Sequence, residues 1–221
     1  YQSMIKSLIQ GGQLLLVTSS KLNLLFSTPV VNITESYNLN EEEKNFLINH
    51  KDLYQTTGCT LYSKDCYVLE HKSQYYFKKY IMQHTREFAY NVLKVNQNIE
   101  IYMTNSWVNY NDKHTTHIRH NHSNSFISGV FYIDGSDIFT TTFFARDNLL
   151  NWDLNYTERN IFNTDQINVQ SEKNQMILFP SSVYHQAPIN MNDETRITLS
   201  FNTWIRGEIG DDRWCTKLHL K

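Results

Sequence analysis

The sequence predicts an α+β fold in which two helices back a β-sandwich or barrel. Asn40 precedes three glutamates, the pattern of an N-cap residue followed by acids in the first turn, so we expect a helix from there to about residue 49. A second helix is expected over about 73–94, where apolar residues recur at helical spacing. From about residue 99 the apolar period changes to two, and short β-rich runs continue to about residue 205. Helices followed by many short strands are typical of a sheet covered on one side by helices.

This pattern divides the chain into an N-terminal extension over residues 1–22 and a single domain over 23–221. The extension lacks a clear hydrophobic period, whereas the segment 29–33 predicts a first strand. The helical support occupies about 40–96 and the β core about 99–205. A chain of 221 residues is long enough to bury one sizeable core.

Composition narrows the classes of partner and the compartment. The chain has 20 basic and 22 acidic residues, so its bulk charge gives no clear nucleic-acid footprint, although a local basic groove stays open. Cys59, Cys66 and Cys215 have neither metal-ligand spacing nor the even number of a disulfide framework, which favours a reducing compartment. No apolar stretch is long enough to span a bilayer. We therefore expect a soluble cytoplasmic protein with no membrane partner, and a homo-oligomer stays open.

A cluster of histidines precedes the most convincing strand of the chain, the run 126–133, which is rich in β-branched and aromatic residues. His120 and His122 are two residues apart in an extended segment, so their side chains project from one face and can aim at a common ion. The alternative is a solvated, histidine-rich loop. His114 and His117 lie ahead of the strand, and we expect them at the surface or near the entrance of a site.

A third histidine and an arginine follow much later in the chain. His185 comes just past an apolar strand and a turn, where a distant imidazole can complete a metal site begun by the first two. Arg196 opens a run in which it shares one polar face with Ser200. A buried arginine needs an anion, and its planar fork matches a carboxylate. The alternative is an ordinary ion pair with Asp193 or Glu194.

The motifs occur in the order His-x-His, Ser-x-x-Ser-Gly-Val-x-Tyr, Leu-Phe-Pro-Ser-x-x-x-His and Arg-x-x-x-Ser-Phe-Asn. Their order and spacing resemble the iron(II)/2-oxoglutarate oxygenase superfamily, specifically an uncharacterised branch often seen in phage and marine bacterial genomes, over residues from about 26 to 202. The resemblance implies a double-stranded β-helix (jelly-roll) core with a facial metal triad. His120 and His185 match its two histidines, and Arg196 matches its cosubstrate arginine. The resemblance also suggests that Tyr132 helps to hold the far carboxylate of 2-oxoglutarate.

The middle ligand departs from the superfamily pattern, because His122 stands where Asp or Glu is usual. A dianionic cosubstrate can offset the charge of iron without a protein carboxylate, so we expect His120, His122 and His185 to bind Fe(II) together. Two alternatives stay open. Asp134 or Asp137 can replace His122 as a ligand, although both lie beyond the strand that follows the histidine pair, or a position can stay open for a halide.

The function implied by the resemblance is an iron(II)- and 2-oxoglutarate-dependent dioxygenase. It would couple decarboxylation of 2-oxoglutarate to oxidation of an unknown substrate by dioxygen, with hydroxylation as the default result. Paired carboxylates, a Ser-His-Asp set and a Gly-rich phosphate loop are missing from the sequence, so we expect no catalytic residues beyond the metal ligands. A phage-encoded enzyme would work in the host cytoplasm.

Two other functions stay open at this point. One is a non-catalytic jelly-roll protein, metal-binding or structural in a virion. The other is a cupin-like dioxygenase with three histidines and no cosubstrate, in which Arg196 would grip the carboxylate of the substrate itself.

Seven further residues have expected positions. Asn109 lies on the strand leading to the histidine pair and is expected near the metal-proximal end of the cosubstrate, with Ser200 as a further cosubstrate contact. Trp107 and Trp204 lie in strand-like segments and are expected in the core. Three residues of the long polar segment can line a substrate entrance or pack within their loop: Trp152, Tyr156 and Arg159.

Overall fold

The computed structural model describes residues 27–49, 52–55, 60–145 and 155–221. The N-terminal extension expected over 1–22 lies outside these ranges, as do Cys59 and Trp152. Within them, no helix combines the length and the apolar character needed to cross a membrane.

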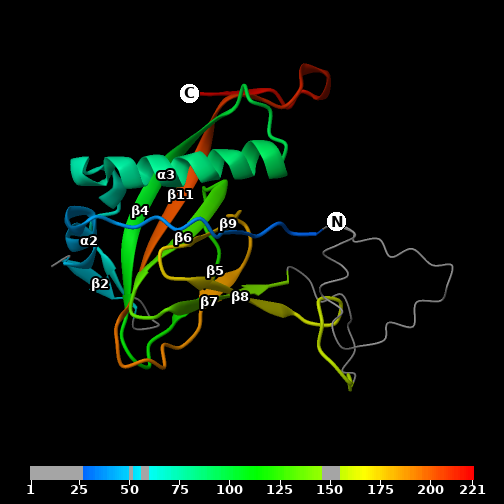
Figure 1. Ribbon diagram of the computed structural model, residues 1–221. Coiled ribbons are helices and arrows are strands. Elements are labelled where there is room, and N and C mark those ends of the chain that lie inside the picture. Colours follow the sequence, from blue (N-terminus) through cyan, green and yellow to red (C-terminus); the bar gives the residue numbers. More distant parts are fainter. Residues whose placement is uncertain (1–26, 50–51, 56–59, 146–154) are drawn as a thin grey trace.

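Two antiparallel sheets of unequal size form the core (Figure 1). The major sheet has eight strands in the order β1-β9-β6-β11-β4-β3-β2, with β12 paired to β11, and the minor sheet has the order β5-β10-β7-β8. This is the jelly-roll core that the sequence and the resemblance predict. The strands of the major sheet are β1 (Val31–Ile33), β2 (Leu53–Gln55), β3 (Leu61–Ser63), β4 (Glu100–Asn111), β6 (Ile127–Asp134), β9 (Met176–Pro180), β11 (Arg196–Ile209) and β12 (Leu218–Leu220). Those of the minor sheet are β5 (His117–His120), β7 (Ile138–Phe144), β8 (Gln166–Glu172) and β10 (His185–Ala187).

The two expected helices are present. Helix α2 (Glu41–Ile48) begins at a capping box, in which the Asn40 side chain accepts from the Glu43 N–H and the Glu43 carboxylate accepts from the Asn40 N–H, both at 2.9 Å. The second helix consists of three consecutive pieces: the 3₁₀ turn η2 (Lys72–Gln74), α3 (Tyr75–Glu87) and the π-helical turn η3 (Phe88–Val92). Two further 3₁₀ turns are η1 (Val68–Glu70) and η4 (Asp212–Trp214).

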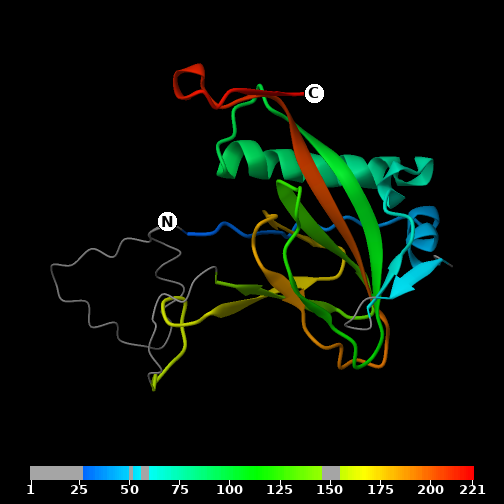
Figure 2. The ribbon, with the colours of Figure 1, turned by 180° about the vertical axis from the view of Figure 1, so that it is seen from behind.

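Helix α3 covers the face of the major sheet that is turned away from the minor sheet, as both ribbon views show (Figures 1 and 2). Strand β6 shows how a period of two serves both faces. Phe131 points to the helix layer, where its ring meets Phe77 edge-on at 4.7 Å, while Tyr132 points between the sheets and stacks on Phe139 at 4.8 Å. One hydrophobic layer therefore lies under the helices, and a smaller one lies between the sheets.

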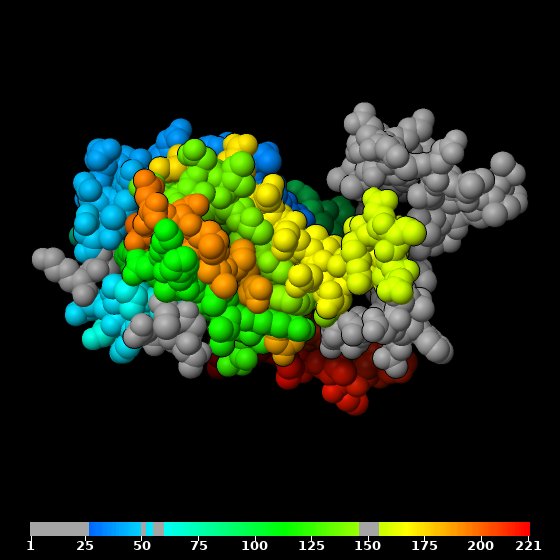
Figure 3. All heavy atoms as spheres, turned by 90° about the horizontal axis from the view of Figure 1, so that it is seen from below, coloured from blue at the N-terminus to red at the C-terminus, as the bar shows by residue number. Residues whose placement is uncertain are grey.

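The β4–β5 and β10–β11 connections lie side by side at one end of the sandwich (Figure 3, green and orange). The His114 N–H donates to the Asn190 carbonyl at 2.8 Å, and the Asn190 N–H donates to the Thr115 carbonyl at 2.9 Å. These two connections cover the end from which β11 starts.

Candidate metal centre

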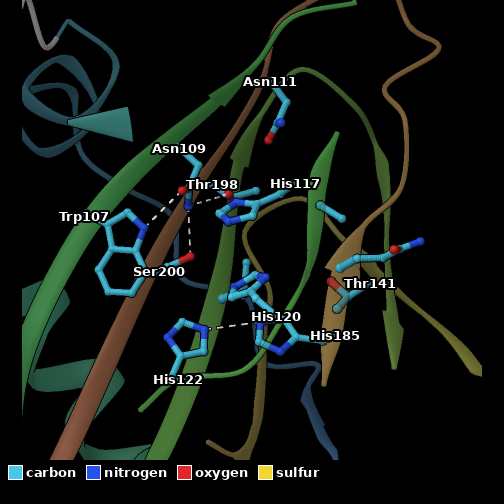
Figure 4. Close-up of a pocket in the computed structure, with 13 residues that line it drawn as sticks. Trp107, Asn109, Asn111, His117, His120, His122, Thr141, His185, Thr198 and Ser200 are labelled. Carbon is cyan, nitrogen blue, oxygen red and sulfur yellow. Dashed lines mark hydrogen bonds between the residues drawn. The ribbon is translucent and has the colours of Figure 1, made fainter. Parts of the chain in front are cut away.

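Strand pairing in the minor sheet brings the three predicted histidines together (Figure 4). His120 ends β5 and His185 begins β10, and the antiparallel register places the two directly opposite each other. His122 follows two residues after the end of β5. The ligand atoms of the three imidazoles all lie within 4.8 Å of one another, and no other metal-binding group of this kind occurs among the described residues.

Two of the rings are each oriented by a hydrogen bond to the backbone carbonyl two residues earlier in the chain. The Nδ1 of His120 lies 2.7 Å from the Ile118 carbonyl, and the Nδ1 of His185 lies 3.0 Å from the Val183 carbonyl. Since a carbonyl can only accept, each Nδ1 carries the proton and each Nε2 lone pair is free for a metal.

The free nitrogens already have a spacing that suits coordination. The Nε2 atoms of His122 and His185 face each other at 3.3 Å. Neighbouring nitrogens at right angles around an ion, with bonds of about 2.1 Å, would be roughly 3 Å apart. The donor set and its spacing therefore fit a single divalent cation.

Burial keeps these imidazoles neutral. It lowers the pKa of His122 to about 4, assisted by repulsion from His120. It lowers the pKa of His185 to about 3 and that of His120 below its usual value. At neutral pH the rings are unprotonated, as metal ligands must be.

A serine network holds His122 from behind. The His122 N–H donates to the Ser181 carbonyl at 3.0 Å, and the Ser181 hydroxyl lies 2.7 Å from those of Ser125 and Ser128. Ser128 in turn donates to the Asn202 Oδ1 at 2.8 Å, and a hydrogen bond with Asn202 raises the pKa of His122 against the larger effect of burial. The sequence analysis named these residues as parts of three motifs but gave them no role. Their recurrence in those motifs could have indicated one.

The pocket beside the histidines is small, with a cavity volume of about 40 Å³, and it is partly open to solvent. On β4 and β11, the side chains that line the pocket are connected by a chain of hydrogen bonds. The Trp107 indole donates to the Asn109 Oδ1 at 3.0 Å, and the Asn109 amide donates to Ser200 at 2.9 Å and to Thr198 at 3.4 Å. Asn109 and Ser200 therefore line the pocket.

The expectation that Trp107 is a core residue is wrong. Its ring lies 5.7 Å from that of His122 and lines the pocket. Trp107 shares the inter-sheet face of β4 with Asn109, because residues two apart in a strand point the same way. Trp204 is half-buried.

His117 was expected at the surface or near the entrance of a site, and it lines the pocket. Strand β5 begins at this residue, and its ring stacks on His120 with centroids 4.4 Å apart and planes 17° apart. Burial lowers the pKa of His117 to about 4, with further repulsion from His120 and Arg196. His117 is thus a fourth imidazole of the pocket, whereas His114 is exposed.

Arg196 is buried and lacks an acidic partner. Its side chain is 7% exposed, one terminal nitrogen donates to the Pro188 carbonyl at 2.9 Å, and its Nε has no hydrogen-bond partner within the described ranges. Burial lowers the pKa of Arg196, which means that the charged form lacks compensation. The alternative ion pair with Asp193 is wrong, because Asp193 pairs with Lys113 at 2.5 Å, and no ion pair with Glu194 occurs in the described part of the chain.

Tyr132 lies near this guanidinium. It is 2% exposed, and its hydroxyl lies 2.7 Å from that of Thr141, a pocket residue. Burial raises the pKa of Tyr132 to about 12, while hydrogen bonds with Thr141 and Ser171 and the charge of Arg196 act in the opposite direction. Neither Tyr132 nor Arg196 forms the surface of the pocket itself.

The alternative carboxylate ligands do not join the histidines. Asp134 pairs with Lys173 at 2.5 Å and with Lys44 at 3.4 Å, and neither Asp134 nor Asp137 belongs to the group of candidate ligands. In the long polar segment, Arg159 lies over the Tyr156 ring at 4.7 Å, as loop packing predicts.

Comparison with a family model gives a match over residues 105–202, described as "Putative 2OG-Fe(II) oxygenase". The matched segment, slightly less than half of the chain, contains all three histidines and Arg196. A search of curated protein sequences finds no match.

Several solved structures share the fold of this chain. The epimerase SnoN from nogalamycin biosynthesis, in complex with Fe³⁺, alpha ketoglutarate and nogalamycin RO, has a TM-score of 0.55 and 12% identity over 80% of this chain and 78% of that one. A prolyl-4-hydroxylase from Pseudomonas putida has a TM-score of 0.54 and 10% identity over 82% of this chain and 95% of that one. A 2OG-Fe(II) oxygenase family oxidoreductase from Burkholderia pseudomallei has a TM-score of 0.55 and 8% identity over 79% and 83%.

Proposed function

We propose that the chain is a 2OG-Fe(II) oxygenase in which His120, His122 and His185 hold the iron and Arg196 receives the distal carboxylate of 2-oxoglutarate. The observation that carries this assignment is the convergence of three imidazoles, all within 4.8 Å, in a pocket where His117 feels the charge of the buried Arg196. Bound iron and 2-oxoglutarate supply the oxidising chemistry that side chains lack.

Arg196 suits a carboxylate for two reasons. A buried charge without a counter-ion is unfavourable, so an anionic ligand has a large advantage there. Its Nε–H also has no partner within the described ranges, and a carboxylate can accept from it in the paired geometry typical of arginine. Tyr132 is the second candidate contact for the same carboxylate, since Arg196 and Tyr132 interact electrostatically.

Asn109 and Ser200 have a different part in the proposal. They line the pocket between Trp107 and the buried end of β11, and their hydrogen bonds to each other fix the positions of their polar atoms. We assign them to contacts along the cosubstrate. Their network keeps the wall rigid, which favours binding in one orientation.

An all-histidine triad leaves the charge of the iron to be balanced by the cosubstrate. No carboxylate belongs to the candidate ligand group within the described residues, and Arg196 supplies one positive charge nearby. The dianionic cosubstrate would offset two of these three positive charges, so we expect iron and 2-oxoglutarate to bind cooperatively.

Hydroxylation of an as yet unidentified primary substrate is the outcome we propose, with dioxygen as the oxidant. We place the enzyme in the cytoplasm because Cys66 and Cys215 are free thiols.

The test is to incubate the protein anaerobically with Fe(II) and 2-oxoglutarate, admit oxygen, and measure succinate. We expect succinate in wild type and none in a His185→Ala variant, even if turnover without the primary substrate is slow. Oxygen consumption that is independent of 2-oxoglutarate would instead indicate a dioxygenase without a cosubstrate. Tightly bound metal with no response to 2-oxoglutarate would indicate a non-catalytic metal site.

A further inference from the structure

A cationic groove runs along the outer side of α3, away from the metal centre. It encloses about 440 Å³. Four cationic side chains and two buried apolar ones line it: Lys72, Lys78, Lys79, Arg86, Leu69 and Met82. We call it the α3 groove.

The helix period builds this groove. Tyr75, Lys79, Met82 and Arg86 follow one another at intervals of four, three and four residues, so they lie along one side of α3 over about 17 Å. Lys72 extends the line by one turn through η2.

The charge of the groove differs from that of the chain as a whole. Its four cations face a single carboxylate, Glu70, whose two oxygens both accept from Lys78 at 2.6 and 2.7 Å. Lys72, Lys79 and Arg86 have no ion-pair partner within the part of the chain that the structure describes. Three exposed positive charges thus gather on one side of a helix in a chain whose net charge is −2.

Exposed aromatic rings stand at one end of the groove. Tyr75 is 62% exposed and Tyr76 is 69% exposed, and their rings meet edge-on at 5.2 Å. Neither ring is buried in the protein, so two flat apolar surfaces face solvent next to the cations. Aromatic planes beside a positively charged groove are the combination that binds single-stranded nucleic acid, since bases stack while lysine and arginine contact phosphates.

We propose that the α3 groove binds nucleoside phosphates, as a single-stranded nucleic acid or as a free nucleotide. Lys72, Lys79 and Arg86 contact the phosphates, and Tyr75 stacks on a base. An acidic peptide would satisfy the cations, but its carboxylates would leave the tyrosine plane unused. The groove volume is also within the usual range for small-ligand sites.

The groove and the metal centre lie on opposite faces of the major sheet. Helix α3 packs on one face through Phe77 and Phe131, whereas the histidines lie between the two sheets (Figures 1 and 4). A ligand in the groove is therefore bound independently of the iron site, and succinate formation should not depend on the groove residues.

Fluorescence anisotropy with a labelled mixed-sequence single-stranded DNA oligonucleotide tests the proposal, and unlabelled AMP and ATP serve as competitors. With about three phosphate contacts, affinity should fall roughly 20-fold between 50 and 200 mM salt. The triple variant Lys72→Gln, Lys79→Gln, Arg86→Gln should lose this salt dependence together with the binding. Tyr75→Ala should weaken binding by about tenfold.

A second triple variant with the same change of charge, Lys113→Gln, Arg213→Gln, Lys217→Gln, is the matched control, because its residues lie outside the groove. Both triple variants should keep the wild-type melting temperature. Competition by AMP or ATP as effective as by the oligonucleotide would identify a nucleotide site, and weaker competition a strand-binding site. The proposal is overturned if wild type binds neither ligand, if the control variant loses as much affinity as the groove variant, or if poly-glutamate competes as well as DNA and Tyr75→Ala has no effect.

Discussion

His120 and His185 are held by the carbonyl two residues earlier in the chain, at 2.7 and 3.0 Å. An extended backbone makes this contact available, and the contact selects the tautomer in which Nε2 is the ligand atom. Replacing His185 with Ala should therefore reduce Fe(II) affinity by more than about 100-fold, the upper range for loss of an outer-shell partner. His114→Ala is the matched control, since this histidine is exposed and lies outside the pocket. Isothermal titration with Fe(II) under anaerobic conditions measures both, and equal affinities would contradict the ligand assignment.

Loss of the Arg196 side chain should affect the binding of 2-oxoglutarate, whereas loss of a histidine should affect the binding of iron. Arg196→Ala should leave Fe(II) affinity near that of wild type. It should weaken the binding of 2-oxoglutarate by about 2–5 kcal/mol, the usual effect of removing one partner of a buried charge pair. Arg196→Lys keeps the charge but loses the planar fork, so it should restore only part of the affinity. Anaerobic titration of the iron-loaded variants with 2-oxoglutarate gives the answer. An alanine variant that binds 2-oxoglutarate normally would place the anchor elsewhere.

Asn202 tests the support behind His122. Its amide hydrogen-bonds with this histidine and accepts from Ser128 at 2.8 Å. Asn202→Ala should lower Fe(II) affinity by about 10–100-fold while the fold is kept, because a misoriented ring coordinates poorly. Asn192→Ala, in the β10–β11 connection, is a control in the same residue type. A loss of affinity in both variants would point to general destabilisation.

At the scale of elements, the sequence predicted the helices and strands themselves but not which strands pair with each other. The helices and the long strands follow from local period, and the Asn40 capping box is visible in the sequence. That His185 lies opposite His120 depends on the pairing of β10 with β5, strands that are 64 residues apart, and local pattern cannot fix such a pairing. Family resemblance supplied it instead. The sequence left the position of His117 open between the surface and the entrance of a site, because β5, four residues long, carries no apolar alternation.

Helix α3 contributes stability through the layer that it covers. Phe77 is fully buried and meets Phe131 edge-on. Phe77→Ala should lower the free energy of unfolding by about 3–5 kcal/mol. Because this layer lies on the far side of the major sheet from the histidines, Fe(II) affinity of the folded variant should stay close to that of wild type. Denaturant unfolding together with iron titration separates the two effects, and a large loss of iron affinity without destabilisation would contradict this separation.

Asp134 ties the end of β6 to two other segments, through Lys173 and Lys44. Burial acts to raise its pKa, but hydrogen bonds from Lys173 and the Gly135 N–H and the charges of both lysines hold the pKa below 3.8. A carboxyl with a lowered pKa in the folded state adds stability above its unfolded pKa, and that contribution is lost as the pH falls through the folded value. Asp134→Asn should therefore be less stable than wild type at pH 7, and the difference should shrink as the pH falls below the ordinary pKa of an aspartate, ~3.9. Chemical unfolding at a series of pH values measures it, and a difference that is independent of pH would exclude the ionic explanation.

In the molecule as a whole, the candidate metal centre lies between the two sheets, and the outer side of α3 stays accessible to other ligands. The chain belongs to a fold shared with an epimerase and a prolyl-4-hydroxylase, so the fold alone does not select the reaction outcome. The candidate ligand group consists of three imidazoles, and a fourth, His117, stacks on His120. The nearby Arg196 guanidinium has no acidic partner among the described residues.

The most direct test of this account is an anaerobic crystal structure with Fe(II) and 2-oxoglutarate. We expect one iron bonded to the Nε2 atoms of His120, His122 and His185 at about 2.1 Å, with the distal carboxylate of 2-oxoglutarate on Arg196. Iron bound through a carboxylate side chain in place of His122, or 2-oxoglutarate with both carboxylates away from Arg196, would contradict it.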